Sequence, residues 1–252
     1  MTLEQIEGVN PVVEALRAGR PLTRIFVARD LHRPAVDRLV ALARERGVPL
    51  QEVSRERLSQ LARSRAHQGV VALAAARDYA DLGEVLDRAT VPFLVALDEL
   101  QDPQNLGAII RTADAVGADG VIVPARRSAG LSPSVLKASA GAAEHVSVVR
   151  VTNLVGTLKF LQERGLWVVG ADAAGDRCYW EADFRDPLTL VIGGEHRGLR
   201  RLVRETCDHV LRIPMAGKLD SLNAAAAAAV FMFEVARQRT ARVLDLSNRR
   251  TL

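Results

Sequence analysis

The chain has 252 residues, of which 48% are hydrophobic and 25% charged, a composition typical of a folded globular protein. This composition excludes a disordered chain and a collagen-like repeat, and no apolar run reaches the ~18 residues that a membrane span requires. The 34 Lys and Arg residues against 30 Asp and Glu residues give a net charge of +4, which does not by itself indicate nucleic-acid binding.

The expected compartment follows from the first residues and from the cysteines. The start of the chain shows neither a basic nor an apolar signal segment, so we expect no secretory signal. Cys178 and Cys207 are too few for a disulfide framework, which favours a reducing compartment, the cytoplasm. The five histidines show no metal-ligand spacing with the cysteines or with each other, so we expect no metal. Because no apolar run is long enough to span a membrane, we also expect no membrane association.

The first part of the chain is predicted to form a small α/β unit. One helix is expected to begin at Asn10 as its N-cap, a second to span residues 34–46, and a third to follow Ser54. The strands are expected over 24–28, 49–53 and 69–73. A change in composition follows, and we place the domain boundary within residues 77–91, where a short helix over 81–89 is expected.

The second part alternates strands and helices more clearly. The strands are predicted over 93–97, 120–123, 146–149, 167–170, 188–192 and 209–213. The helices are predicted over 106–116, 133–139, 154–163, 199–205 and 222–238. This alternation indicates a parallel sheet covered by helices on both faces. Because ligands bind beyond the carboxyl ends of such strands, three strand-end loops become the candidate site.

The first two loops follow apolar strands and lead into helices. The first contains Asn105 and Arg111, six residues apart; alone, Asn105 could equally be an N-cap and Arg111 a solvated cation. The second contains Gly193 and Gly194, whose backbone N–H groups can face a ligand, and Glu195, which could equally stabilise the first helical turn.

The third loop, residues 213–223, enters a long alanine-rich helix. Ser221 is the predicted N-cap of this helix, and the run of small residues over 224–229 suits close packing against a helix or a cofactor. The chain has no G-x-G-x-x-G fingerprint, no G-x-S-x-G elbow and no phosphate loop.

Together and in this order, the three loops resemble those of the TrmH family of 2′-O-ribose methyltransferases, within the SPOUT superfamily. The three matching motifs are Asn105…Arg111, Gly193-x-Glu195-x-x-Gly198, and Ile213-Pro214-Met215 followed by Ser221-Leu222-Asn223. The segments that more narrowly resemble the bacterial 23S rRNA (guanosine-2′-O)-methyltransferase branch, called RlmB, are 8–12, 67–69, 141–144, 150–154 and 204–208. The resemblance therefore covers nearly the whole chain.

The resemblance implies an α/β fold in two domains and a partner. Residues 1–76 would be an L30e-like RNA-binding domain, 77–91 a linker, and 92–252 a SPOUT domain whose parallel sheet ends in a deep trefoil knot. The cofactor would be S-adenosyl-L-methionine, the substrate 23S rRNA, and the protein a homodimer. The chain departs from the family pattern at His196, usually Gly, and at Ala224-Ala225, usually Val-Ser.

Site residues carry over from the matched motifs. The catalytic set is Arg111, Asn105, Glu195, Ser221 and Asn223. The cofactor set is Gly193, Gly194, Ile213, Met215 and Leu222. A guanidinium is a poor base because its pKa exceeds ~12, so we interpret Arg111 as binding the adjacent RNA phosphate, which helps to relay the proton, and steering the ribose hydroxyl. The basic residues expected to add RNA affinity in the first domain are Arg17, Arg20, Arg24, Arg63 and Arg65.

Three other functions remain open on the sequence alone. A tRNA 2′-O-methyltransferase of the same family differs only in its substrate. A non-enzymatic RNA-binding protein that keeps the scaffold would account for the departures at His196 and Ala225. A nucleotide-dependent oxidoreductase lacks its phosphate fingerprint.

Overall fold

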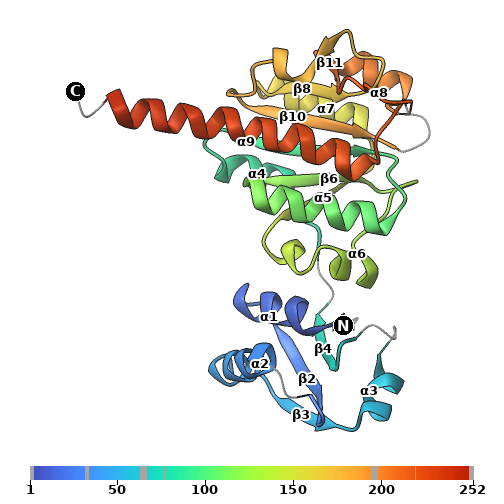
Figure 1. Ribbon diagram of the computed structural model, residues 1–252, viewed down its shortest axis with the longest axis vertical. Helices are drawn as coiled ribbons and strands as arrows, with labels where there is room; N and C mark the ends of the chain where they lie inside the picture. The colour runs from blue at the N-terminus through green and yellow to red at the C-terminus, as the bar shows by residue number, and fades with distance from the viewer. Residues whose placement is uncertain are drawn as a thin grey trace. The chain divides into compact units, whose positions relative to one another are not determined.

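The computed structural model describes residues 3–31, 34–62, 67–75, 78–194, 198–218 and 220–249. The chain forms two compact units (Figure 1). The first comprises Met1–Asp78 and Leu131–His145, and the second comprises Tyr79–Gly130 and Val146–Leu252. None of the described helices is long and apolar enough to cross a membrane.

The first unit is built on a four-stranded sheet in the order β1-β4-β2-β3. The strands are β1 (Leu3–Glu7), β2 (Leu22–Ala28), β3 (Leu50–Val53) and β4 (Val70–Ala75). The helices are α1 (Val9–Arg17), α2 (Pro34–Glu45), α3 (Arg55–Leu61), α6 (Pro133–Ala138) and the 3-10 turn η1 (Ala142–Glu144). Strand β1, which pairs antiparallel with β4, was not predicted because Glu4, Gln5 and Glu7 mask its apolar residues.

The start of α1 corrects one expectation. The helix begins at Val9, and Gly8 with a φ of 102° occupies the N-cap position that was predicted for Asn10. The value of φ explains the shift, because a left-handed backbone at this point favours glycine. Asn10 therefore lies inside the first turn.

A buried ion cluster attaches the segment 131–145 to the rest of the first unit. Arg20 pairs with Glu4 and with Glu144, and each of the three side chains is at most 12% exposed. Arg20 is therefore committed to this cluster, so its expected role in RNA binding is wrong. The segment lies within the range 92–252 assigned above to the catalytic domain, so the spatial units and the sequence domains differ here.

The second unit carries a seven-stranded, all-parallel sheet in the order β7-β6-β5-β10-β8-β11-β9. Its strands are β5 (Phe93–Asp98), β6 (Gly120–Pro124), β7 (Ser147–Val151), β8 (Trp167–Ala171), β9 (Arg177–Cys178), β10 (Leu188–Gly193) and β11 (His209–Arg212). Its helices are α4 (Leu82–Arg88), α5 (Pro103–Val116), α7 (Leu154–Glu163), α8 (Arg201–Thr206), α9 (Ala224–Arg249) and the 3-10 turn η2 (Tyr179–Glu181). The predicted parallel α/β architecture is confirmed, whereas the two-residue strand β9 was too short to predict.

Helices cover both faces of this sheet. Helices α5 and α9 pack together on one face, and α4, α7 and α8 pack with alternate strand residues on the other (Figure 1). The central strands β5 and β10 are buried at every residue, in accord with their continuous apolar sequences. The trefoil knot and the L30e likeness of the first unit stay predictions.

Candidate active site

The three predicted loops meet at one edge of the seven-stranded sheet. Strand β10 lies between β5 and β8, and its last residue, Gly193, lies beside Asp98 at the end of β5. A pocket of about 370 Å³ opens at this edge. The residues that line it are Ala171, Asp172, Ala173, Ala174, Ile192, Gly193, Gly194, Gly198, Ile213, Met215, Asp220, Ser221, Leu222, Ala224, Ala227 and Phe231. All five predicted cofactor-binding residues and Ser221 are therefore brought together.

The wall of this pocket is mainly apolar side chains and backbone. Its volume lies in the range of ~300–1000 Å³ that small-molecule sites occupy. Glycine is required where the loop after β10 folds back, since a Cβ on Gly193 would lie 2.2 Å from the carbonyl carbon of Gly198. Such a pocket suits a ligand with a flat apolar base that main-chain groups recognise, and an adenosyl group fits that description.

Two asparagines connect the first and third motifs. The Nδ2 of Asn223 donates to the Oδ1 of Asn105 over 2.9 Å, and Asn105 is only 6% exposed. The Oδ1 of Asn223 accepts from the backbone N–H groups of Ala225 and Ala226, so Asn223 caps α9. The prediction that Ser221 is this N-cap is wrong, and Ser221 instead lines the pocket.

The N-cap of α5 is Asp102, whose Oδ1 accepts from Gln104 N over 2.9 Å. The capping explanation for Asn105 is therefore wrong, and its Oδ1 instead accepts from Asn223. This removes the simplest structural reason for an asparagine at position 105.

Arg111 lies on α5, two turns beyond Asn105. Its side chain is exposed, and no hydrogen bond or ion pair holds it among the described residues. An exposed guanidinium of this kind can bind a phosphate group of a substrate. Glu195 and His196 lie outside the described residues, so the structure places four of the five predicted catalytic residues.

Two aspartates that the sequence analysis did not single out hold the end of the second loop. Asp98 accepts from the backbone N of Arg200 over 2.8 Å and from its Nε over 2.7 Å. Asp172, just after β8, accepts from the backbone N of Leu199 over 3.1 Å and from that of Ala174 over 2.9 Å. The available signal was an acidic residue directly after an apolar strand, at the edge where ligands bind.

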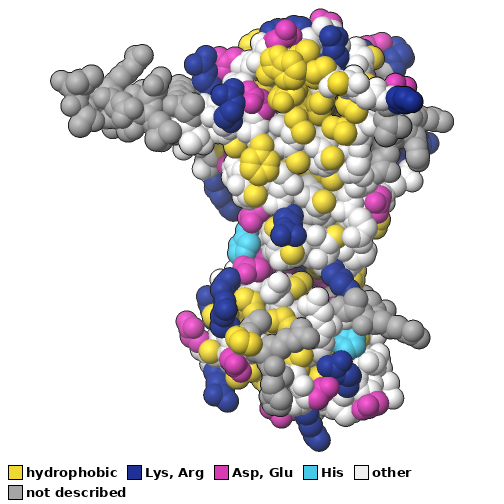
Figure 2. All heavy atoms as spheres, in the orientation of Figure 1, with side chains coloured by type: hydrophobic (Ala, Val, Ile, Leu, Met, Phe, Trp, Pro, Cys, Tyr) yellow, Lys and Arg dark blue, Asp and Glu magenta, His cyan; other side chains and the backbone are white. Residues whose placement is uncertain are grey.

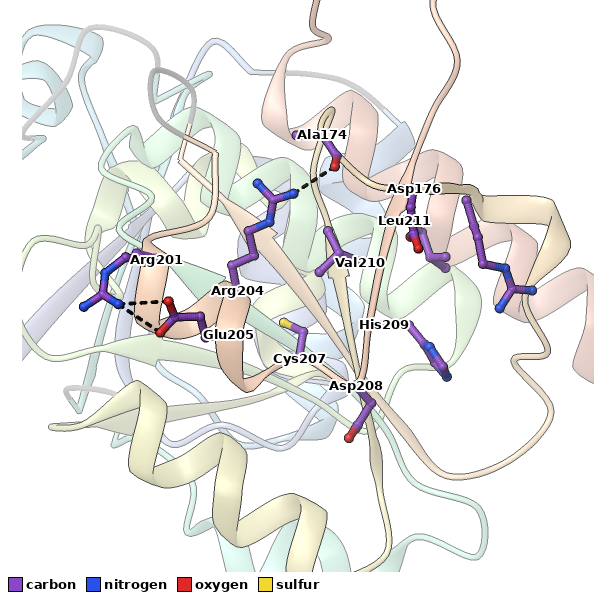
Figure 3. A pocket seen from close by; sticks show the side chains of 11 residues that line it. Ala174, Asp176, Arg201, Arg204, Glu205, Cys207, Asp208, His209, Val210 and Leu211 are labelled. Atoms are coloured by element: carbon purple, nitrogen blue, oxygen red, sulfur yellow. Dashed lines mark hydrogen bonds and ion pairs between the residues drawn. The ribbon is translucent and has the colours of Figure 1, made fainter.

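A larger pocket, of about 540 Å³, shares Ala174 with the first pocket but has different chemistry (Figure 3). Arg201 pairs with Glu205 over 2.9 Å, and Arg204 donates to the carbonyl oxygen of Ala174 over 2.8 Å. Burial, with a smaller contribution from Asp208, raises the pKa of Cys207 to about 12. The thiol therefore stays protonated at neutral pH and is a poor nucleophile.

None of the described residues of the three motifs lines this larger pocket. Within the described ranges there is also no group of three His, Cys, Asp or Glu side chains that could hold a metal ion. The smaller pocket at the carboxyl edge is therefore the candidate active site.

Comparisons with known proteins agree with this assignment. Residues 92–233 match the SpoU rRNA Methylase family, and residues 5–80 match a family described as RNA 2′-O ribose methyltransferase substrate binding. YacO of Bacillus subtilis (strain 168), assigned to the TrmH family of tRNA/rRNA methyltransferases, is 46% identical over 240 residues, covering 94% of this chain and 96% of YacO.

Two solved structures extend the similarity to three dimensions. The SpoU methyltransferase AviRb from Streptomyces viridochromogenes, solved with AdoMet, has a TM-score of 0.81 at 30% identity and covers 95% of this chain and 91% of its own. An AdoMet-bound rRNA methyltransferase from Sinorhizobium meliloti has a TM-score of 0.77 at 30% identity, with 93% and 87% covered. The chain thus belongs to the SpoU, or TrmH, family of RNA 2′-O-ribose methyltransferases, which act on tRNA or rRNA.

Proposed function

We propose that this protein transfers a methyl group from S-adenosyl-L-methionine to the ribose 2′-hydroxyl of a guanosine in 23S rRNA. The observation that carries the proposal is that Gly193, Gly194, Ile213, Met215 and Leu222 all line one pocket, although the motifs that contain them are separated in sequence. The family membership of the chain and the AdoMet found in two similar structures support the same cofactor.

The cofactor would be held by backbone and apolar groups. The main chain at Gly193, Gly194, Ile213 and Leu222 would bind the adenosine, with Phe231 closing the wall behind it. When bound, S-adenosyl-L-methionine supplies an electrophilic methyl group on its sulfonium. Most of the pocket wall needs only to hold this group and to exclude water, which explains why most of its side chains, other than Asp172 and Asp220, are small or apolar.

The polar residues would align the RNA. Arg111 would bind the phosphate next to the target nucleotide and thereby fix the ribose hydroxyl in line with the methyl group. The hydrogen bond between Asn105 and Asn223 would keep the first and third motifs in register while the RNA binds. Ser221, at the pocket wall, and Glu195 would organise the reacting groups.

The choice of 23S rRNA rests on the family descriptions and on the extent of the resemblance. The matched family is named for rRNA, and the Sinorhizobium meliloti neighbour is an rRNA methyltransferase that covers most of this chain. The test is to incubate the protein and labelled donor with total RNA and to map the modified ribose. Label at one guanosine 2′-oxygen of 23S rRNA is expected, and label confined to tRNA would contradict the substrate.

The first unit would select the RNA without taking part in the chemistry. Residues 5–80 match a substrate-binding family, and Arg17 and Arg24 are exposed on this unit. Deleting residues 1–76 would uncover the segment 131–145, so replacing Arg17 and Arg24 by Ala is the cleaner test. We expect a higher KM for RNA and a shallower salt dependence, with an unchanged Kd for the donor. A changed donor Kd at constant KM for RNA would contradict this division.

We also propose a two-fold dimer built through the second unit. Figure 2 shows hydrophobic side chains gathered on the face where α9 lies, and Phe233 of α9 is 56% exposed and Trp180 52% exposed. Exposed apolar surface of this kind marks an interface. Light scattering should report about twice 27.3 kDa, and Phe233→Glu should shift the protein towards monomer, whereas Phe160→Glu on α7 should not. A monomeric wild-type protein that methylates RNA would contradict the proposal.

A further inference from the structure

Four carboxylates bind backbone N–H groups at the two edges of the seven-stranded sheet. At the amino edge, Asp119 accepts from Phe93 N and Asp208 accepts from Val168 N, each over 2.7 Å. At the carboxyl edge, Asp98 and Asp172 accept from two neighbouring backbone N–H groups, those of Arg200 and Leu199 (the contacts described above). The first pair stabilises the starts of strands, whereas the second pair acts on the loop that forms the candidate active site.

The two carboxylates at the carboxyl edge approach this loop from opposite sides. Asp98 ends β5 and Asp172 follows β8, the two strands that flank β10. The side chain of Asp98 is 0% exposed and that of Asp172 is 12% exposed. Hydrogen bonds to charged acceptors that are shielded from water are stronger and more directional than neutral ones. We call Asp98 and Asp172 the carboxylate clamp.

Within the loop, Gly198 N donates to Gly194 O over 3.1 Å, but this bond does not engage the N–H groups of Leu199 and Arg200. Arg200 occupies the N-cap position of α8, but its side chain makes no capping hydrogen bond to the first backbone N–H groups of the helix. The clamp supplies acceptors for the N–H groups of Leu199 and Arg200. Gly198, just before them, lines the pocket at a φ of +59°, a left-handed conformation that glycine adopts readily, so the clamped residues directly follow a turn in the pocket wall.

Cationic side chains keep each member of the clamp in place. The guanidinium of Arg200 binds Asp98 and also lies 3.3 Å from Glu99 Oε1. Arg204 approaches Asp172 Oδ1 to 3.9 Å while donating to the backbone of Ala174. The clamp therefore ties the loop after β10 to the loops after β5 and β8 through charged hydrogen bonds.

We infer that Asp98 and Asp172 are positioning residues that hold the described end of this loop, residues 198–200, in the conformation that binds the methyl donor. The inference rests on the proposed function, because the ligand of the pocket is assigned there. The two aspartates act through the backbone of Leu199 and Arg200 and not by contact with the reacting atoms.

The test compares Asp98→Asn and Asp172→Asn with the matched controls Asp119→Asn and Asp208→Asn. Each change replaces one carboxylate oxygen by an NH2 group, which cannot accept a hydrogen bond, and removes the negative charge. Both oxygens of Asp98, Asp172 and Asp208 accept hydrogen bonds, so each of these variants loses one. Asp119→Asn loses the charge but can keep its hydrogen bond to Phe93 N through the remaining oxygen. Titration calorimetry with S-adenosylmethionine and with S-adenosylhomocysteine, which lacks the sulfonium charge, gives the Kd, and thermal unfolding gives the Tm. We expect both ligands to bind about tenfold more weakly to the two clamp variants and within about twofold of wild type to both controls, with a lower Tm in Asp208→Asn, which loses a hydrogen bond.

Several results would overturn the inference. Unchanged affinities in both clamp variants, or equal losses in the controls, would show that the carboxylates at the carboxyl edge serve stability alone. A loss confined to S-adenosylmethionine would show a direct effect of negative charge on the sulfonium and not positioning of the loop.

Hydrogen exchange separates this inference from the proposed function. The backbone amides of Leu199 and Arg200 should exchange faster in the clamp variants, whatever ligand the pocket takes. The wild-type protein could fail to bind either ligand while the variants still exchange faster. This result would contradict the proposed function, but the clamp would still order the loop. Unchanged exchange would overturn the clamp. If Asp98→Asn does not fold, Arg200→Met removes the side-chain contact alone and should give a smaller increase in the exchange rate, and no increase would contradict the inference.

Discussion

The two pockets described on the second unit differ in the side chains that line them, and this difference does not follow from their volumes. The larger one, of about 540 Å³, is lined by arginines and acidic residues that pair with each other or with backbone. The smaller one, of about 370 Å³, has glycines, small apolar residues and the ends of the loops that carry the motifs. The place of the smaller pocket at the carboxyl ends of the strands, where ligands bind in parallel sheets, and not its volume, makes it the candidate site.

Arg111→Ala gives the largest expected effect and tests the comparison directly. Methyl transfer should fall by at least about 100-fold, because the substrate phosphate loses its ligand while the fold and donor binding stay intact. Arg201→Ala in the larger pocket removes a guanidinium that is paired with Glu205, and should leave transfer unchanged. Single-turnover assays on RNA measure both variants, and equal rates would remove Arg111 from the mechanism.

Gly193→Ala should close the smaller pocket. Its Cβ would lie 2.2 Å from the carbonyl carbon of Gly198, so the loop after β10 must shift. We expect donor affinity to fall by more than tenfold. Gly217→Ala is the control because a Cβ there meets nothing within 4 Å. Calorimetry with S-adenosylhomocysteine measures both, and retained affinity in Gly193→Ala would place the donor elsewhere.

Asn223 allows capping to be separated from contact with Asn105. Asn223→Ala removes both interactions and should lower stability by ~1 kcal/mol and activity by about tenfold. Asn223→Asp keeps an accepting oxygen for the cap of α9 but cannot donate to Asn105. If the contact matters, Asn223→Asp keeps the Tm and loses activity, measured per folded molecule. Restored activity in this variant would favour capping alone.

Cys207 in the larger pocket gives the smallest expected effect. Its folded pKa of about 12 exceeds the ordinary value of 9.0, because burial disfavours the thiolate. The contribution of this thiol to stability is therefore complete below pH 9 and is lost as the pH rises towards 12. Cys207→Ala should flatten the fall of Tm between neutral pH and about pH 10. Cys178→Ala is the control. If Tm falls equally steeply with pH in wild type and in Cys207→Ala, the raised pKa of Cys207 is contradicted.

The sequence predicted the elements of the second unit well and its polar contacts less well. Continuous apolar runs such as 93–97 and 188–192 are recognisable as buried strands, and the motifs after them pointed to one edge of a sheet. Local patterns assigned the cap of α9 to Ser221, whereas Asn223 takes it because it also reaches Asn105, 118 residues away. Such a contact depends on the packing of α5 on α9, which local spacing does not encode.

The first unit shows the same limit at longer range. The small α/β character of residues 1–76 followed from alternating patterns, but the membership of 131–145 in this unit did not. In the ion cluster of Arg20, Glu4 and Glu144, the pair formed by Arg20 and Glu144 joins residues 124 positions apart. A basic residue in an RNA-binding context is expected to be exposed, and only the burial of Arg20 shows that it serves the fold.

The most direct test of the central claim is a crystal structure of the protein with S-adenosylhomocysteine. The account predicts density for the adenosyl group in the pocket at the carboxyl edge, against the backbone of Gly193, Gly194, Ile213 and Leu222, with the sulfur open towards the side where substrate enters. Density in the larger pocket would contradict this account. An empty pocket at the carboxyl edge, in crystals grown at a ligand concentration that saturates the protein in solution, would contradict it as well.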